Sequence, residues 1–410
     1  MVAFASGVRA PFARYWLSGF LADFGDGVRL AAFPLLVAQL SHSPSEVAAV
    51  TAVQSLPGLL SGGLGVIADR IDRRRLMVAV DITRAAVIMG LAAAILGHAA
   101  GLMLIYLAAF VTGAGSALRN TAAVTCVPRL VQPANLDQAN GRMIVGQIVG
   151  NELAGPAAGG WLFGLAAVLP FAVNAGTLGI AVLLLLTLPS VFRPPPRPQQ
   201  QYPQRRMAPL ASVRHDLAEG VRWLRQHPAI RDLTIAVGVI AAMDSAWFAV
   251  LVLYVITDLH QQPGAYGLLL AVGALGGVLA GGFGTPLTRR LGPWRSLLAA
   301  GLVMAASQTV LGLTSNVITA AAMIFASSAA FALFNMTAVT MRQRQVPAAL
   351  LGRVTGLYGS VALGAETLGA VSGGALATVA GIRAPMLAGA LPLALVTVWL
   401  AWKHHRTQPA

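Results

Sequence analysis

Ionisable side chains interrupt several long apolar stretches of this sequence. Asp23, Asp26 and Arg29 recur at three-residue spacing, which places them on one face of a helix. Other carboxylates near the middle of apolar stretches are Glu152, Asp244 and Glu366. At the centre of a bilayer, an ionisable group is stable only where it faces other helices, pairs with an opposite charge or takes up a proton. The chemistry that these residues predict is therefore proton transfer inside a membrane.

The candidates for proton coupling are Asp26, Glu152, Asp244 and Glu366. An apolar environment favours the neutral form of a carboxyl group, so such a group could bind and release a proton near neutral pH. Two structural alternatives stay open: Asp26 and Arg29 could form a static ion pair, or the carboxyl groups could stay protonated and only pack. Asp81 and Arg84 are expected to form a separate structural pair near one end of their helix.

A second set of residues is expected to line a substrate cavity, namely Asp23, Arg29, Arg119, Trp247, Phe248 and Asn335. For the aromatic residues, packing in the core is an alternative role. Near mid-membrane, acidic residues outnumber basic residues by five to two. The acids are Asp23, Asp26, Glu152, Asp244 and Glu366, and the bases are Arg29 and Arg119. This balance predicts that neutral or cationic amphiphiles are preferred over anions.

Residue usage argues against several other chemistries. Lys403 is the only lysine, which excludes a phosphate-binding loop with its lysine and a buried Schiff base. Cys126 is the only cysteine, so an intramolecular disulfide is impossible. His404 and His405 are adjacent without further ligands, which argues against a metal site, and the other histidines are scattered. We therefore expect no enzymatic activity, no cofactor and no metal.

The composition predicts a membrane protein. Hydrophobic residues make up 57% of the 410 residues and charged residues only 10%, whereas soluble domains are about 25% charged. At roughly 20 residues per span, the length allows about twelve helices. Apolar stretches fall near residues 13–39, 46–68, 76–97, 101–127, 139–164, 167–188, 231–257, 265–287, 295–314, 317–341, 353–379 and 384–402.

Basic residues alternate between the connections. Arginines gather at both termini and in every second connection, whereas the remaining connections carry only Arg383. Because basic residues accumulate on cytoplasmic loops, both termini are expected in the cytoplasm, with the first helix retained as an anchor. The same rule explains the net charge of +14 without a nucleic-acid partner. The expected location is the inner membrane of a bacterium.

The stretches divide the chain into two pseudo-symmetric six-helix bundles, residues 1–189 and 231–403. Residues 190–230 are expected to form a cytoplasmic linker with an amphipathic helix, and residues 404–410 a cytoplasmic tail.

An internal repeat supports this division. Residues 150–162 (GNELAGPAAGGWL) and 364–376 (GAETLGAVSGGAL) share six positions 214 residues apart, which include both glutamates. A weaker match, offset by 216, pairs Gly65, Arg73 and Arg74 with Gly281, Arg289 and Arg290. Duplicated halves are typical of secondary transporters. The small residues expected to pack helices closely are Gly155, Pro156, Gly159, Gly160, Gly369 and Gly373.

The segment GVIADRIDRRR at residues 65–75 resembles the loop 2–3 signature of the major facilitator superfamily. The matching residues are Gly65, Asp69, Arg70, Arg73 and Arg74. The resemblance implies the twelve-helix fold over the whole chain, a monomer, and a role for these residues as a cytoplasmic latch of the outward-facing state. An acidic residue at the inner end of the fourth helix often completes that latch, and this chain has Arg129 there instead.

The run from Gly155 to Gly160 is similar to the antiporter motif of the superfamily's exporters, except that Asn151 stands where the motif begins with glycine. Together with residues 24–34 and 81–84, it resembles the branch of drug and siderophore exporters. The expected function is proton-coupled efflux of small hydrophobic or amphiphilic compounds by alternating access. Alternatives are a lipid or lysolipid flippase, a nutrient symporter, or a membrane receptor or scaffold that transports nothing.

Overall fold

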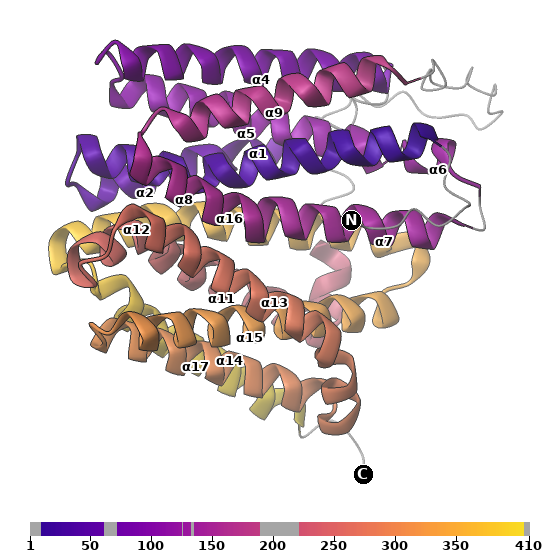
Figure 1. Ribbon diagram of the computed structural model, residues 1–410. Helices are drawn as coiled ribbons and strands as arrows, with labels where there is room; N and C mark the ends of the chain where they lie inside the picture. Colours follow the sequence, from indigo (N-terminus) through magenta and orange to yellow (C-terminus); the bar gives the residue numbers. More distant parts are fainter. Residues whose placement is uncertain (1–9, 61–71, 125, 133–134, 189–220, 406–410) are drawn as a thin grey trace. The chain divides into compact units, whose positions relative to one another are not determined.

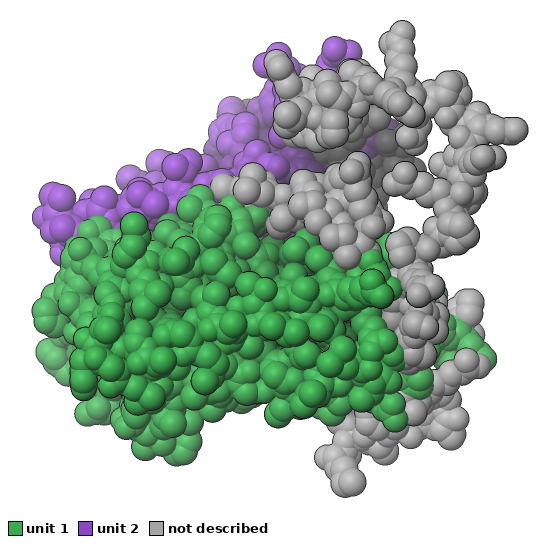
Figure 2. Space-filling view, turned by 90° about the horizontal axis from the view of Figure 1, so that it is seen from above, with its two compact units in different colours: residues 1–197, 252–271 green, residues 198–251, 272–410 purple. Residues whose placement is uncertain are grey.

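The computed structural model describes residues 10–60, 72–124, 126–132, 135–188 and 221–405. Every element in these residues is a helix, and no strand occurs among them, as expected for an all-α membrane protein (Figure 1). The chain divides into unit 1, residues 1–197 and 252–271, and unit 2, residues 198–251 and 272–410 (Figure 2). Most of the linker predicted at residues 190–230 lies outside the described residues. Within its described part, residues 221–226 are helical.

Unit 1 holds the first six long helical segments. Its helices are α1 (Ala10–Leu40), α2 (Pro44–Ser55) continuing as η1 (Leu56–Leu60), α4 (Arg73–Leu96), α5 (Leu102–Val124), α6 (Val127–Leu130), α7 (Leu136–Gln147), the π-helix η3 (Ile148–Ala154), α8 (Gly155–Leu165) and α9 (Leu169–Leu186). The helices α7, η3 and α8 follow one another without a turn and form one continuous helical segment. Helix α1 lies at the centre of the unit, packed against α8 and α9, and α4 packs against α5 and α9.

Unit 2 holds most of the other six long segments. Its helices are α11 (Pro228–Phe248), the greater part of α13 (Pro263–Leu291), α14 (Pro293–Leu313), α15 (Val317–Gln345), α16 (Ala348–Ala380) and α17 (Ala384–His405). The short α12 (Leu251–Leu253), the π-helix η4 (Tyr254–Asp258) and the start of α13 belong mainly to unit 1. Helix α11 packs against α16 and α17, and α14 packs against α15 and α17.

Eight of the helical segments in the described residues are long and apolar enough to cross a membrane by composition alone. Helix α1 is 31 residues long, but Asp23, Asp26 and Arg29 interrupt its apolar run. The described part of α2 is only 12 residues long. The segments α7–α8 and α16 are rich in glycine and carry Glu152 and Glu366. Three of the segments that miss the criterion thus carry candidate carboxylates, although α4, α5 and α11 meet it despite charged residues of their own.

Local signals explain several helix ends. The Asp72 carboxylate accepts hydrogen bonds from the backbone N–H groups of Arg74 and Arg75 at the start of α4. Asn316 caps α15 in the same way. Gly292 and Gly381 have φ values of 80° and 92°, so they form the sharp turns before α14 and after α16 that other residues would make with strain.

Glycines let the fifth segment of each half approach the first. A Cβ atom added to Gly159 of α8 would lie less than 3.0 Å from the Val28 carbonyl oxygen of α1. One added to Gly373 of α16 would lie equally close to the Ala246 carbonyl oxygen of α11. Backbone contacts this close require glycine. The repeated sequence therefore makes the same helix crossing twice, once in each unit.

Candidate functional site

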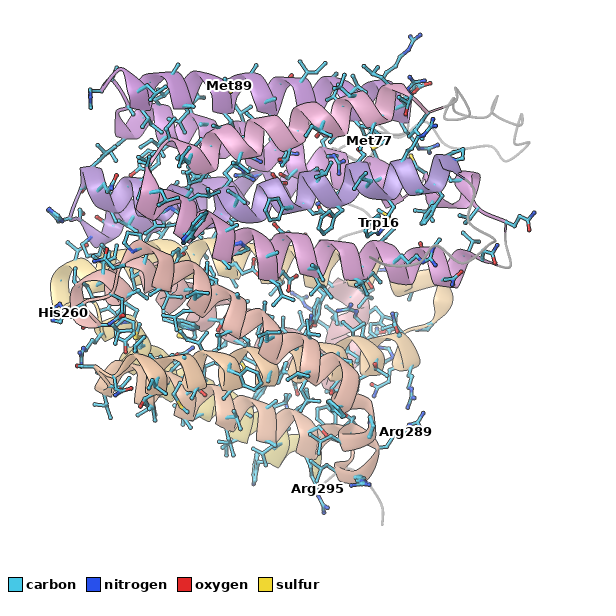
Figure 3. The ribbon with its side chains drawn as sticks, in the orientation of Figure 1. Trp16, Met77, Met89, His260, Arg289 and Arg295 are labelled. Carbon is cyan, nitrogen blue, oxygen red and sulfur yellow. The ribbon has the colours of Figure 1, made fainter. Side chains whose placement is uncertain are left out.

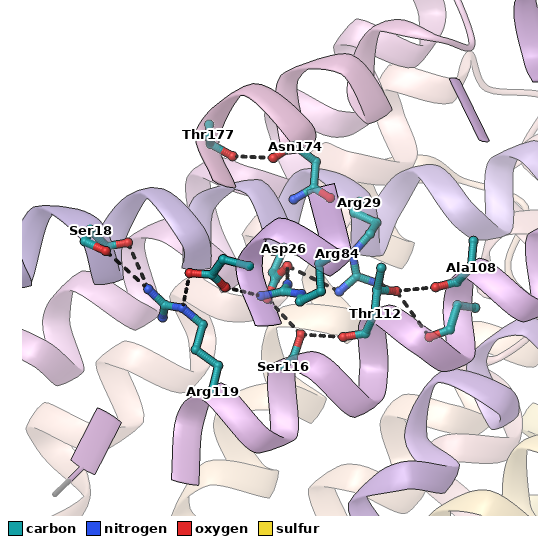
Figure 4. A network of polar contacts seen from close by, with 12 residues as sticks. Ser18, Asp26, Arg29, Arg84, Ala108, Thr112, Ser116, Arg119, Asn174 and Thr177 are labelled. Atoms are coloured by element: carbon teal, nitrogen blue, oxygen red, sulfur yellow. Dashed lines mark hydrogen bonds and ion pairs between the residues drawn. The ribbon is translucent and has the colours of Figure 1, made fainter. Parts of the chain in front are cut away.

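A buried polar network lies in unit 1, where α1, α4 and α5 meet (Figure 4). Asp26 of α1 is its centre. One carboxylate oxygen, Oδ1, accepts hydrogen bonds from Arg84 of α4 and, at 3.3 Å, from Arg29 one turn further along α1. The other, Oδ2, accepts one from the Ser116 hydroxyl of α5 at 3.0 Å. The side chain of Asp26 is nevertheless 16% exposed, so one edge of the network remains accessible.

Asp81 of α4 is the second acidic centre. Arg84 Nη1 donates to Asp81 Oδ1 at 3.3 Å, and Arg119 Nε of α5 donates to Asp81 Oδ2 at 2.9 Å. Arg119 also donates to the Ser18 carbonyl oxygen of α1 at 3.2 Å. Arg84 thus bridges the two aspartates, and the chain of contacts ties three helices together.

Burial makes these contacts strong. Arg29 and Arg84 are 2% and 1% exposed, and Asp81 is fully buried. A glycine on α5 makes room for one of them. Gly115 of α5 lies beside the stem of Arg84, and an added Cβ there would be 2.5 Å from Arg84 Cδ. Each charge is stable in this interior because an opposite charge faces it, and removing a single partner leaves an uncompensated charge.

Two cavities adjoin the network. One, of about 480 Å³, is lined by Asp23, Arg119 and Tyr15 among others, and a smaller one of about 130 Å³ is lined by Asp23, Asp26 and Arg29. They share the side chains of Asp23, Asn120 and Gln147. The sequence-predicted residues Asp23, Asp26, Arg29 and Arg119 are therefore brought to one place that is polar at its base and accessible at its edge.

The site contains two charged residues, Asp81 and Arg84, that the count of mid-membrane charges leaves out. Arg84 was expected to pair with Asp81 apart from Asp26, but it contacts both. With Asp81 and Arg84 included, the site holds three acids and three bases, namely Asp23, Asp26, Asp81, Arg29, Arg84 and Arg119. The charges of this network are therefore balanced, whereas the count from the sequence also includes Glu152, Asp244 and Glu366. The preference for neutral or cationic amphiphiles stays a prediction.

Sequence reasoning also missed the polar side chains of α5. Thr112 Oγ1 accepts a hydrogen bond from Arg29 Nη1 at 3.0 Å, and Ser116 contacts Asp26. Thr112, Ser116 and Arg119 recur at spacings of four and three residues on one face of an otherwise apolar helix. This polar stripe is the signal that could have found them.

Glu152 lies outside the network. It sits in the π-helix η3 and is exposed, and among the described residues it makes no hydrogen bond or ion pair. The same segment packs on α1, because a Cβ added to Gly27 would lie 2.7 Å from the Asn151 carbonyl oxygen. Glu152 and Asp26 are thus connected through the backbone contact between η3 and the residue that follows Asp26. Single π-turns within α-helices are frequent at functional sites.

The candidates of unit 2 form a smaller group. The indole Nε1 of Trp247 donates to Asp244 Oδ1 at 3.0 Å, and Trp247 is 3% exposed. The ring of Phe248 packs edge-to-face with the ring of Trp247, with 5.9 Å between the ring centroids. Glu366 is half-buried and close enough to Asp244 for their charges to interact. Asn335 is exposed on α15 and makes no hydrogen bond with these residues within the described part of the chain.

The predicted latch is described only in part. Gly65, Asp69 and Arg70 lie outside the described residues. Arg74, at the start of α4, donates a hydrogen bond to the Leu186 carbonyl oxygen at the end of α9. Arg14 of α1 donates to the neighbouring Thr187 carbonyl oxygen at 3.5 Å. Cations at a helix C-terminus interact favourably with its exposed carbonyl groups.

The sequence matches the protein family described as transmembrane secretion effector over residues 2–407. The enterobactin exporter EntS of Escherichia coli O1:K1 is 27% identical over 378 residues, which cover 89% of this chain and 85% of the exporter. The multidrug efflux pump Tap of Mycolicibacterium fortuitum is 28% identical over 416 residues, which cover 95% of each chain.

Solved structures show the same fold. A bacterial homologue of the iron transporter ferroportin, in an inward-facing state, superposes with a TM-score of 0.74 at 18% identity and covers 95% of this chain and 98% of its own. The nucleoside transporter NupG gives a TM-score of 0.72 at 14% identity, over 97% and 99% of the two chains.

Proposed function

Because the chain belongs to the transmembrane secretion effector family of the major facilitator superfamily, within its drug and siderophore exporters, we propose that it couples export of small amphiphilic molecules to proton entry. The relatives EntS and Tap, by their names an enterobactin exporter and a multidrug efflux pump, align with nearly the whole chain. The substrate leaves chemically unchanged under this proposal, and the protein acts as a monomer in the bacterial inner membrane. The alternation of basic connections supports cytoplasmic termini.

The observation that carries the proposal is the position of Asp26. Its carboxylate balances Arg84 and Arg29 at the base of an accessible cavity. When a proton neutralises Asp26, both guanidinium groups lose their shared anion, and the contacts between α1, α4 and α5 weaken together. A proton and a substrate that favour different arrangements of this network would compete, which is the requirement for antiport.

Glu152 is proposed to act with Asp26 as the second coupling carboxylate. It lies on η3, which contacts α1 through Gly27 and Asn151. A change in the charge of Glu152 would therefore act on the helix that holds Asp26. Asp244 and Glu366 occupy the corresponding half of the repeat and are kept as secondary candidates.

The test is substrate-dependent proton movement in proteoliposomes that contain a pH-sensitive dye. With an acidic lumen and a transported compound added outside, wild-type protein is expected to move the compound inward and to release protons from the lumen. The panel consists of lipophilic cations, neutral drugs and an anionic catecholate siderophore. Glu152→Gln and Asp26→Asn are each expected to abolish this coupled proton flux. Glu152→Gln is also expected to keep proton-independent exchange of labelled substrate across the membrane, since its side chain makes no contact within the described network.

Glu46→Gln serves as the control, because Glu46 lies in the first turn of α2 outside the network. Its proton flux should equal that of wild type. Several results would contradict antiport. Redistribution of a lysolipid without proton movement would favour a flippase, and proton movement in the same direction as the substrate would favour a symporter. If no substrate is moved and neither variant has a phenotype, the protein is a receptor or scaffold.

A further inference from the structure

A second cavity, of about 440 Å³, lies within unit 2. It is formed where the end of α13, the start of α14 and the end of α15 meet. Apolar walls come from Trp294, Met336 and Met341. The hydroxyl groups of Thr288 and Thr337 lie 3.5 Å apart in it. The cavity therefore combines apolar surface with hydrogen-bonding groups, and Asp244 is not among its lining residues.

Two arginines line this cavity from different helices. Arg289 of α13 and Arg344 of α15 are both exposed, and Arg289 lies at the same end of the unit as Arg295 (Figure 3). Neither lining arginine makes a hydrogen bond or ion pair with any described residue. The described lining residues include no carboxylate, and Asp232 of the same unit forms an ion pair with Lys403 at 2.7 Å. The positive charge of the cavity is thus not neutralised by the described protein.

The repeat provides an internal comparison. Arg289 and Arg290 match Arg73 and Arg74 in the sequence repeat. In unit 1 the protein itself uses this basic pair, since Arg74 donates to the Leu186 carbonyl oxygen and Arg73 also has a partner. In unit 2 the corresponding guanidinium groups are left available for an external anion.

The N-terminus of α14 adds to the positive potential. Gly292 and Pro293 line the cavity and begin this 21-residue helix. Gly292 has no side chain to cap the helix. The first turn of a helix carries partial positive charge and favours anions such as phosphate. The two arginines and the helix end thus surround one space.

An apolar stripe runs along α13 beside the cavity. Phe283, Leu287 and Leu291 recur at four-residue spacing and are 73%, 43% and 38% exposed. Leu287 directly precedes Thr288 of the cavity wall. On a membrane-spanning helix, such side chains face acyl chains. A free anion would leave this stripe and the methionines of the cavity unused.

We propose that this cavity binds an anionic phospholipid, with its phosphate between Arg289 and Arg344 and an acyl chain along the α13 stripe. Basic pockets between membrane helices are suited to anionic headgroups, and each arginine near the surface contributes about 1 kcal/mol, or about five-fold in affinity. The site shares no residue with the coupling network of unit 1. A failure of this proposal would therefore leave the proposed transport activity unaffected, and the reverse also holds.

The test is native mass spectrometry of the full-length protein titrated with phosphatidylglycerol or phosphatidylcholine. Wild type is expected to bind phosphatidylglycerol more tightly than phosphatidylcholine. Arg289→Gln and Arg344→Gln should each weaken phosphatidylglycerol binding about five-fold, and the double variant about 25-fold. Arg290→Gln is the matched control, because Arg290 is exposed next to the site but does not line it, and its binding should stay within about two-fold of wild type.

Three results would overturn the proposal. The first is equal binding of both lipids by wild type, a measurement that needs no variant. The second is an equal loss in Arg290→Gln, which would indicate general surface charge. The third is complete displacement of phosphatidylglycerol by millimolar inorganic phosphate, which would show that the site recognises a free anion and gains nothing from an acyl chain. Persistence of the lipid under the same phosphate concentration supports the proposal.

Discussion

Arg84→Met is expected to destabilise the protein by about 3–5 kcal/mol and to abolish transport. Arg84 is 1% exposed and donates to both Asp26 and Asp81, so it is the cation shared by the two acidic centres. Methionine has a similar volume and an unbranched stem that can still occupy the space beside Gly115, so the loss would come mainly from the missing guanidinium group. The measurement is the midpoint of unfolding of the purified protein in detergent, followed by tryptophan fluorescence.

Arg75→Met on the same helix is the matched control. Arg75 is exposed at the start of α4, and its change should stay within about 0.5 kcal/mol of wild type. The double variant Arg84→Met, Asp26→Asn should recover part of the lost stability, because it removes one of the two carboxylates that lose Arg84 as a partner. An Arg84→Met protein that unfolds like wild type would refute the view that the network holds α1, α4 and α5 together.

The architecture could be predicted because it depends on patterns along the chain. The predicted stretches 139–164, 167–188 and 295–314 correspond to helical segments 136–165, 169–186 and 293–313. Long apolar runs between polar turns leave little freedom in such a membrane protein. The assignment to exporters of the major facilitator superfamily, made from the loop signature and the glycine motif, is confirmed by the family match.

The polar network could be predicted only in part, because helical spacing shows which residues share a face and not which helix that face meets. The pair Asp26 and Arg29 follows from the sequence. The contacts that Arg84 and Ser116 make with Asp26 from two other helices do not. The π-helix at Glu152 is a second example. Its matching segment in the repeat is the uninterrupted helix α16, although the two sequences share their glycines and glutamate.

The repeat itself differs between the units in a way that tertiary contacts decide. Gly150 packs on α1, where an added Cβ would lie 3.0 Å from the Phe24 nitrogen atom. Around its repeat partner Gly364, no described residue outside the glycine's own helix turn has a heavy atom within 4 Å of such a Cβ. Identical residues at matching positions therefore differ in whether they make a close helix contact, and the sequence repeat alone could not distinguish them. The contrast also provides controls for a test of the shared helix crossing.

Gly159→Leu is expected to cost about 3 kcal/mol or to prevent folding, and Gly373→Leu is expected to do the same in unit 2. An added side chain at either position meets a backbone carbonyl oxygen at less than 3.0 Å, so a whole helix must shift to accommodate it. The yield of folded protein after size-exclusion chromatography and the midpoint of its thermal unfolding would measure the effect. Transport should be lost wherever the crossing is displaced.

Gly164→Leu on α8 and Gly364→Leu on α16 are the matched controls, because an added Cβ at either position meets no heavy atom of the described neighbouring residues within 4 Å. Each control places the same side chain on the same helix as its test variant, so hydrophobicity and helix propensity change equally. Both should fold with wild-type yield. If the controls lose as much stability as Gly159→Leu and Gly373→Leu, glycine is required along the whole helix and not at the crossing. A loss confined to the test variants would show that the duplicated sequence encodes one packing contact, made separately in each unit.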